Sequence, residues 1–158
     1  MQIAVIGTGE PDEELSPLAE EVGRRLAEAG AVLACGGHGG VMEAAARGAS
    51  EVGEVIGILP EADPARANPY VTHVVATGVG HARNLAVVAS ADAVIAIGGE
   101  WGTLAEIGFA RRLERPVIAL RSWRVTGPGT MEGGPGIEIV QTAEEAVDWA
   151  LAAATGGS

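Results

Sequence analysis

Short apolar segments alternate with longer amphipathic segments along almost the whole chain of 158 residues. The apolar segments have the length of buried strands, and the amphipathic ones repeat their apolar residues every three or four positions, as helices do. We expect strands at residues 2–6, 31–35, 54–59, 71–76, 93–97 and 117–120, with an edge strand at 137–140. We expect helices at residues 15–29, 41–53, 81–90, 104–113 and 142–154.

Strands that alternate with helices join in parallel through right-handed crossovers, and the helices then cover both faces of one sheet. The chain is 47% hydrophobic but only 3% aromatic. Aliphatic side chains must therefore fill the core, as is typical of parallel sheets. The sequence predicts an α/β, Rossmann-like, three-layer fold with a mostly parallel sheet of about six or seven strands. We expect one domain over residues 1–154 and a disordered tail at 155–158.

The formal net charge is −11, and all ten basic residues are arginine. Without lysine, the chain cannot form a Schiff base with pyridoxal phosphate, and it cannot build a Walker-type phosphate loop. An acidic chain also repels the phosphate backbone of nucleic acids. We therefore exclude a pyridoxal-dependent lysine decarboxylase and expect no nucleic-acid partner.

The single cysteine, Cys35, rules out an intrachain disulfide framework and is typical of a reducing compartment. We expect Cys35 to be a small buried side chain and not a nucleophile. The opening segment MQIAVIG enters a strand without a basic leader, and no apolar stretch is long enough to cross a membrane. We expect a cytoplasmic protein with no membrane partner.

Three loops follow strands at the edge of the sheet where ligands bind in such folds. The first, GTGEPDEE at residues 7–14, carries four carboxylates after its glycines. These would repel a pyrophosphate, but they suit the positive end of the following helix. We interpret this loop as a tight turn, with room for an adenine or a ribose against residues 7–9.

The second loop, GGHGG, places four glycines between a strand and a helix. They are Gly36, Gly37, Gly39 and Gly40. Such glycines let a phosphate approach the N–H groups at the helix start, although they also occur simply to close a turn. His38 has no second histidine or cysteine at ligand spacing, so we expect a solvated loop residue and no metal site.

The third loop lies in IAIGGEWGTLAEIGFA, residues 95–110. Gly98 and Gly99 end a strand, and Thr103 with Glu106 matches the S/T-x-x-E pattern of a helix capping box. The same helix start would bind an anion, because a phosphate can use the N–H groups that a capping box satisfies. Just upstream, GHARN offers Arg83 for a bidentate contact to that phosphate.

Three motifs, GGHGGVMEAAARGA, GHARN and GGEWGTLAEIGFA, resemble in order and spacing those of one superfamily. It joins the Lonely Guy cytokinin-activating phosphoribohydrolases, the molybdenum-cofactor carrier proteins and the nucleotide-binding core of DNA-processing protein A. The resemblance covers about residues 1–150, essentially one domain. For the hydrolases, it implies that Gly99, Gly102 and Thr103 hold a 5′-phosphate, while Arg83 and Glu106 are catalytic at the ribose and the N-glycosidic bond.

This chain departs from the hydrolase pattern at two positions. Ile97 stands where the hydrolases usually have proline, and Asn84 where they usually have lysine. The pair of Arg83 and Asn84 and the short chain are more similar to the carrier-like branch. We therefore expect a protein that binds a phosphorylated, nucleotide-like ligand, either molybdenum cofactor or a nucleoside monophosphate, and needs no cofactor for chemistry. The expected ligand-binding residues are Gly36, Gly37, Gly39, Gly40, Arg83, Asn84, Gly98, Gly99, Gly102, Thr103 and Glu106.

Two alternatives stay open. One is a nucleoside 5′-monophosphate phosphoribohydrolase of the cytokinin riboside type, with Arg83 and Glu106 as its catalytic residues. The other is a non-catalytic structural or assembly module, in which Trp101 and Phe109 contact another subunit. The resemblance also implies a homo-oligomer, either a dimer or a tetramer.

Overall fold

A computed structural model describes residues 1–126 and 137–156. Its strands form one sheet in the order β4-β3-β2-β1-β5-β6-β7, and every neighbouring pair is parallel. The strands are β1 Gln2–Gly7, β2 Val32–Cys35, β3 Val55–Leu59, β4 His73–Ala76, β5 Ala93–Ile97, β6 Val117–Leu120 and β7 Glu138–Val140. The predicted Rossmann-like fold is therefore confirmed, with β7 as the expected edge strand.

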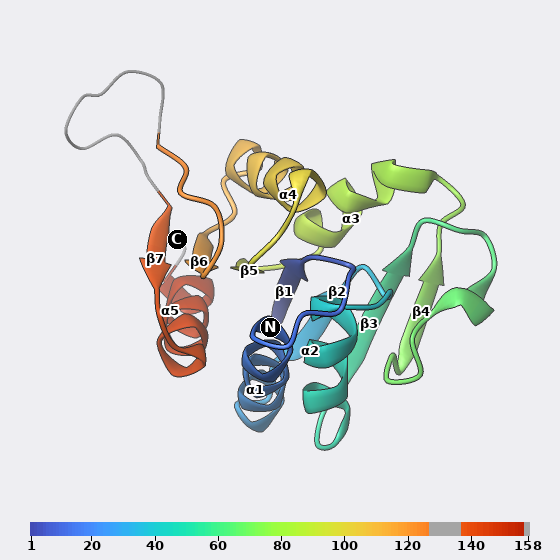
Figure 1. Ribbon diagram of the computed structural model, residues 1–158, viewed down its shortest axis with the longest axis horizontal. Coiled ribbons are helices and arrows are strands. Elements are labelled where there is room, and N and C mark those ends of the chain that lie inside the picture. Colours follow the sequence, from blue (N-terminus) through green and yellow to red (C-terminus); the bar gives the residue numbers. More distant parts are fainter. Residues whose placement is uncertain (127–136, 157–158) are drawn as a thin grey trace.

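Helices cover both faces of the sheet (Figure 1). They are α1 Leu15–Glu28, α2 Val41–Ser50, α3 Arg83–Ala89, α4 Trp101–Arg112 and α5 Ala143–Gly156. In the view of Figure 1, α1, α2 and α5 lie below the sheet, and α3 and α4 lie above it. Short 3-10 helices occur at Pro64–Arg66 and Gly80–Ala82. No helix in the described ranges is long and apolar enough to span a membrane.

Two apolar cores fill the spaces between the layers, because side chains of each central strand alternate between the two faces. The lower core joins the odd positions Ile3 and Val5 of β1 to α1, α2 and α5. The upper core joins Ala4 and Ile6 of β1 to α3 and α4. As composition predicts, the buried residues are almost all Ala, Val, Ile and Leu.

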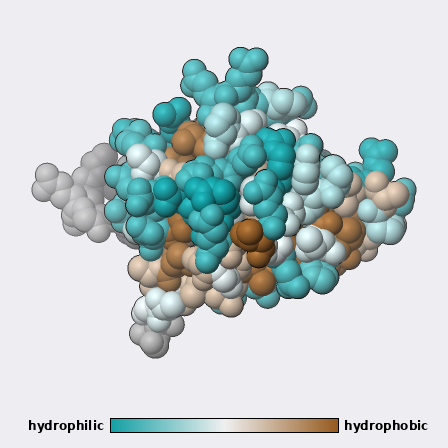
Figure 2. Space-filling view, turned by 90° about the horizontal axis from the view of Figure 1, so that it is seen from below, coloured by the Kyte–Doolittle hydropathy of each residue, from teal (hydrophilic) through white to brown (hydrophobic). Residues whose placement is uncertain are grey.

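The outer surface of α1, α2 and α5 is largely hydrophilic (Figure 2). Arginines and glutamates pair along this face, as in the ion pairs of Arg24 and Arg25 with Glu21 and of Arg47 with Glu20. These pairs are at least one-third exposed, so they contribute solubility more than stability.

Helix boundaries differ from the prediction in ways that matter for the site. Helix α4 begins at Trp101, three residues before the predicted start, so Thr103 lies inside its first turn and is not the cap. The predicted capping box of Thr103 and Glu106 is therefore wrong. Helix α2 ends at Ser50, before the predicted residue 53, and the predicted helix 81–90 divides into a 3-10 turn and α3.

At the C-terminus, α5 continues through Thr155 and Gly156, so the prediction of a disordered tail is wrong at these two residues. A true capping box starts this helix, as predicted for Thr142: the N–H of Glu145 donates to Thr142 Oγ1, and the N–H of Thr142 donates to Glu145 Oε2. Residues 157–158 and the glycine-rich segment 127–136 lie outside the described residues.

Candidate functional site

A cavity lies at the carboxyl ends of β1 and β5, where the order of the strands reverses. In open parallel sheets this is the position at which ligands bind, because the loops on its two sides diverge. The cavity has a volume of about 130 Å³ and opens to solvent. Its lining residues are Val5, Ile6, Gly7, Thr8, Gly9, Gly36, Met42, His81, Arg83, Asn84, Glu100, Gly102, Thr103 and Glu106.

One wall of the cavity is the N-terminal turn of α4. Its N-cap, Glu100, has an extended backbone and no side-chain hydrogen bond to the helix, and the first intrahelical bond runs from the N–H of Leu104 to the carbonyl of Glu100. In the described structure no side chain therefore caps the N–H groups of this first turn. An uncapped helix start combines free donors with the positive end of the helix dipole, so this wall favours an anion.

The turn into α4 depends on Gly99. Its φ of +116° is a backbone conformation that side chains rarely adopt, and a Cβ there would come within 2.5 Å of Thr103 Cβ. Because residue 99 is glycine, the Thr103 side chain can pack against this loop. Thr103 is 3% exposed and lines the cavity.

The opposite wall carries Arg83, the first residue of α3. Its side chain is only 8% exposed, and its buried Nε has no hydrogen-bond partner among the described residues. Burial lowers the pKa of Arg83, although Glu106 opposes that effect. The guanidinium lies directly over Gly36, where a Cβ would overlap Nη1, so glycine is required there for the arginine to enter.

Glu106 lies one turn after Thr103 on the inner face of α4 and is 6% exposed. Burial raises its pKa to about 7, and the charge of Arg83 only partly offsets this. Within the described chain, the two groups influence each other's ionisation but form no direct ion pair. Burying a cation and a carboxyl group without hydrogen-bonded partners lowers the free energy of unfolding. A polar ligand between the two groups would reduce this loss of stability.

The cavity brings together six of the predicted site residues and leaves five outside its lining. Gly36, Arg83, Asn84, Gly102, Thr103 and Glu106 line it. Gly37 packs on Leu59 and Gly57, and Gly40 packs on the carbonyl of Thr8, so both serve to close the turn before α2. Gly39 lies beside a second hollow near His38 and Asn68, and Gly98 and Gly99 face Trp123 on the outer side of the α4 loop.

Cys35 is a small buried side chain, as the sequence predicts, whereas His38 differs from the predicted solvated loop residue. Cys35 is fully buried, which raises its pKa to about 11 and makes it a poor nucleophile at neutral pH. His38 is only about one-third exposed and lies 3.0 Å from Glu61, between its Nε2 and Oε2 atoms, so it is paired and not simply solvated. The described residues contain no cluster of three potential metal ligands.

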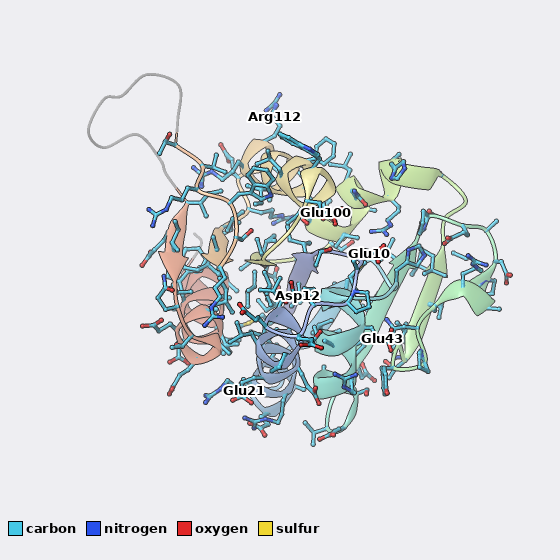
Figure 3. The ribbon with its side chains drawn as sticks, in the orientation of Figure 1. Glu10, Asp12, Glu21, Glu43, Glu100 and Arg112 are labelled. Atoms are coloured by element: carbon cyan, nitrogen blue, oxygen red, sulfur yellow. The ribbon has the colours of Figure 1, made fainter. Side chains whose placement is uncertain are left out.

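Residues 7–9, against which the sequence left room for an adenine or a ribose, line the cavity, whereas sequence reasoning missed Met42, His81 and Glu100. The Thr8 hydroxyl donates to Glu100 Oε1 at 3.2 Å, which ties the loop after β1 to the start of α4. Thr8 and Glu100 both lie in glycine-rich loops that follow strands. This position after a strand is the sequence signal that points to them as lining residues. Figure 3 shows Glu100 and Glu10 on neighbouring loops at this edge of the sheet.

A carboxylate of the acidic first loop lies at the positive end of the following helix, as the sequence predicts. Asp12 Oδ1 accepts the N–H groups of Glu14 and Leu15, both at 2.9 Å, at the start of α1. This carboxylate occupies the positive end of α1, whereas the start of α4 has no side-chain cap in the described structure.

Comparison with known proteins agrees with this geometry. An uncharacterised protein of Archaeoglobus fulgidus is 43% identical over 152 residues, which cover 96% of this chain and 95% of the relative. The structure of the molybdenum cofactor binding protein from Rippkaea orientalis matches with a TM-score of 0.82 and 31% identity, covering 94% of this chain and 93% of that one. The molybdenum cofactor carrier protein of Chlamydomonas reinhardtii matches with a TM-score of 0.78 and 26% identity, covering 96% and 98%.

DNA processing protein A from Helicobacter pylori is 19% identical with a TM-score of 0.69, which shows a shared fold alone. The match to the carrier proteins is therefore stronger in both sequence and structure, which confirms the expected resemblance to the carrier-like branch. A family model matches residues 1–147, nearly the whole chain. The chain accordingly belongs to the SLOG cluster4 family and is similar in sequence and structure to molybdenum cofactor carrier proteins.

Proposed function

We propose that this protein binds a phosphorylated, nucleotide-like ligand in the cavity between β1, β5 and α3, and that molybdenum cofactor is its cargo. The observation that carries this proposal is the buried, unpartnered guanidinium of Arg83 in the same cavity as the uncapped start of α4. A phosphate between them accepts hydrogen bonds from both, which removes the cost of the unsatisfied donors.

The remaining lining suits the rest of such a ligand. Gly7 and Gly9 expose backbone on one side of the cavity, and Met42 adds an adaptable apolar side chain. Asn84 offers an amide, which can both donate and accept. A planar heterocycle with polar edges needs this mixture of apolar surface and a few directed polar groups. The cofactor named for the Rippkaea orientalis and Chlamydomonas reinhardtii proteins is a ligand of this chemical class.

Calorimetric titration with molybdopterin and with AMP tests the proposal. The wild type should bind at least one of them, and Arg83→Gln should weaken binding about tenfold or more, because it removes a charged partner of the phosphate. Arg66→Gln is the matched control, since Arg66 is exposed and lies outside the lining of the cavity. Binding by neither ligand at millimolar concentration would reject the proposal and leave a structural or assembly module as the remaining function.

A second candidate, a nucleoside 5′-monophosphate phosphoribohydrolase, is favoured by one observation. Glu106 is buried beside Arg83 in the cavity, with its pKa raised to about 7, which is suited to proton transfer at neutral pH. This candidate requires the release of free base and ribose 5-phosphate from AMP or a cytokinin nucleotide, and Glu106→Gln should abolish that release. Binding of these nucleotides without release from either one would exclude the hydrolase.

A further inference from the structure

The carboxylate of Glu100 lines the cavity, although a carboxylate cannot donate a hydrogen bond to a phosphate. Glu100 is the N-cap residue of α4, yet its side chain makes no hydrogen bond to that helix. It reaches across the crevice instead, where Glu100 Oε1 accepts the hydroxyl of Thr8 at 3.2 Å. No other hydrogen bond to this carboxylate occurs in the described residues, so most of its accepting capacity is available to a ligand.

Thr8 holds this carboxylate in a defined direction. The N–H of Glu10 donates to Thr8 Oγ1 at 3.2 Å, so the hydroxyl proton of Thr8 is directed at Glu100. Figure 3 shows Glu100 and Glu10 on the two neighbouring loops that this bond joins. The carboxylate therefore lies beside residues 7–9, the part of the lining where the sequence left room for an adenine or a ribose.

We propose that Glu100 selects ligands by the edge of their heterocycle, and that it prefers the 2-amino-4-oxopyrimidine edge that guanine and pterins share. This edge carries a ring N–H beside an amino group, and both donate hydrogen bonds. A carboxylate has about four acceptor positions, so Glu100 can accept both donors while it keeps the bond from Thr8. Adenine carries an amino group beside a ring nitrogen that accepts, and a carboxylate repels that nitrogen. This inference rests on the proposed function and names the class of heterocycle that the site takes.

The other polar side chains of the lining do not distinguish the two edges. His81 and Asn84 can each both donate and accept, so they tolerate either edge. Glu106 lies beside Arg83, and burial raises its pKa to about 7, so a large fraction of it is protonated at neutral pH and can donate as well. Glu100 is therefore the group of the lining whose hydrogen-bonding character is fixed as acceptor only.

The charge of Glu100 also opposes the phosphate that the start of α4 favours. This repulsion is the same for every nucleoside monophosphate, because they share the phosphate and the ribose. The hydrogen bonds at the heterocycle edge, in contrast, differ between guanine and adenine. The ratio of the affinities for GMP and AMP therefore isolates the contribution of the edge.

Calorimetric titration with GMP, IMP and AMP tests the selection. IMP keeps the ring N–H of GMP and lacks its amino group. The wild type should bind GMP about tenfold or more tightly than AMP, with IMP between them. Glu100→Gln presents an amide that accepts with one atom and donates with the other, which fits adenine. The ratio of the GMP affinity to the AMP affinity should therefore fall about tenfold or more in this variant.

Two further variants control for charge and for orientation. Glu10→Gln removes a carboxylate from the neighbouring loop, outside the lining, and should keep the wild-type ratio. Thr8→Val removes the hydroxyl that directs Glu100 and should lower the ratio about threefold. A melting curve by circular dichroism shows whether Glu100→Gln folds as the wild type does, and Thr8→Val supplies the comparison if it does not.

Three results would overturn the selection and leave the proposed function standing. They are equal affinities of the wild type for GMP and AMP, an unchanged ratio in Glu100→Gln, and an equal loss of affinity for both nucleotides in that variant. The last result would place the carboxylate against the ribose, which the two nucleotides share. If the wild type binds none of the three nucleotides and no molybdopterin, the proposed function itself fails, and the selection fails with it.

Discussion

At the scale of single residues, the site is defined by two charged groups that the fold withdraws from water. Arg83 and Glu106 are each less than one-tenth exposed, and neither is neutralised by a direct ion pair in the described structure. The sequence analysis selected both by motif. It could not predict their burial, because burial depends on the layer of helices that covers them and not on their neighbours in the chain.

Glu106 should make the stability of the protein depend on pH. Its pKa rises from 4.5 to about 7 in the folded state, so the folded chain binds more protons than the unfolded chain between these values. The free energy of unfolding must then fall as the pH rises through this window, by about 3 kcal/mol from this group. Glu106→Gln stays neutral and should lack this loss.

Urea unfolding of both chains at about pH 5 and about pH 8 measures the effect, since it gives the free energy of unfolding at each pH. The variant should gain stability relative to the wild type at the higher pH. Glu13→Gln, which removes an exposed carboxylate of the first loop, controls for the change in net charge. Equal pH dependence in Glu106→Gln and the wild type would show that Glu106 is not held in a raised-pKa environment.

At the scale of secondary-structure elements, the decisive contrast is between the starts of α4 and α5. Both have a threonine followed three residues later by a glutamate. At α5 the pair forms a capping box, whereas at α4 the helix starts earlier and turns both side chains toward the cavity. The sequence pattern is the same in the two places, and only the position at which the helix starts decides whether the pair caps the helix or lines the cavity.

Two substitutions should separate these roles. Thr142→Ala removes the cap of α5 and should lower the free energy of unfolding by about 1 kcal/mol. Thr103→Val keeps the shape of the buried side chain and removes its hydroxyl, so it should weaken the binding of AMP or molybdopterin with a smaller loss of stability. Chemical unfolding and calorimetry measure the two effects, and a larger stability loss for Thr103→Val than for Thr142→Ala would contradict the assignment.

At the scale of the whole molecule, the order of the strands determines where the cavity lies. β1 lies between β2 and β5, so the loop after β1 and the loop after β5 flank the same crevice although their residues are about 90 positions apart. The hydrogen bond from Thr8 to Glu100 joins these two loops directly. A ligand that fills the crevice therefore contacts both halves of the sheet and should stabilise the complete fold.

Thermal unfolding detects this stabilisation. A ligand that binds only the folded chain adds about 2.7 kcal/mol to its stability at a concentration one hundred times its dissociation constant. AMP or molybdopterin, whichever binds, should raise the melting temperature of the wild type accordingly. At the same concentration, tenfold weaker binding leaves Arg83→Gln with about 1.4 kcal/mol of added stability or less. An equal shift in that variant and in the wild type would show that the ligand binds elsewhere.

The alternation of apolar strands and amphipathic helices determined the fold by itself, because the period of a hydrophobic pattern is a local property of the chain. It predicted β5 and β6 at their observed bounds and the edge position of β7. The glycine-rich motifs likewise identified the three loops that meet at the cavity, since a Rossmann-like sheet puts all such loops at one edge.

Tertiary structure alone decided which residues of those loops line the cavity. Gly36 faces Arg83, whereas Gly37 and Gly40 pack against strands and loops behind it. The start of α4 at Trp101 and the burial of Glu106 were equally out of reach of the sequence. Each depends on contacts between segments far apart in the chain, and such contacts set burial, charge pairing and helix register together.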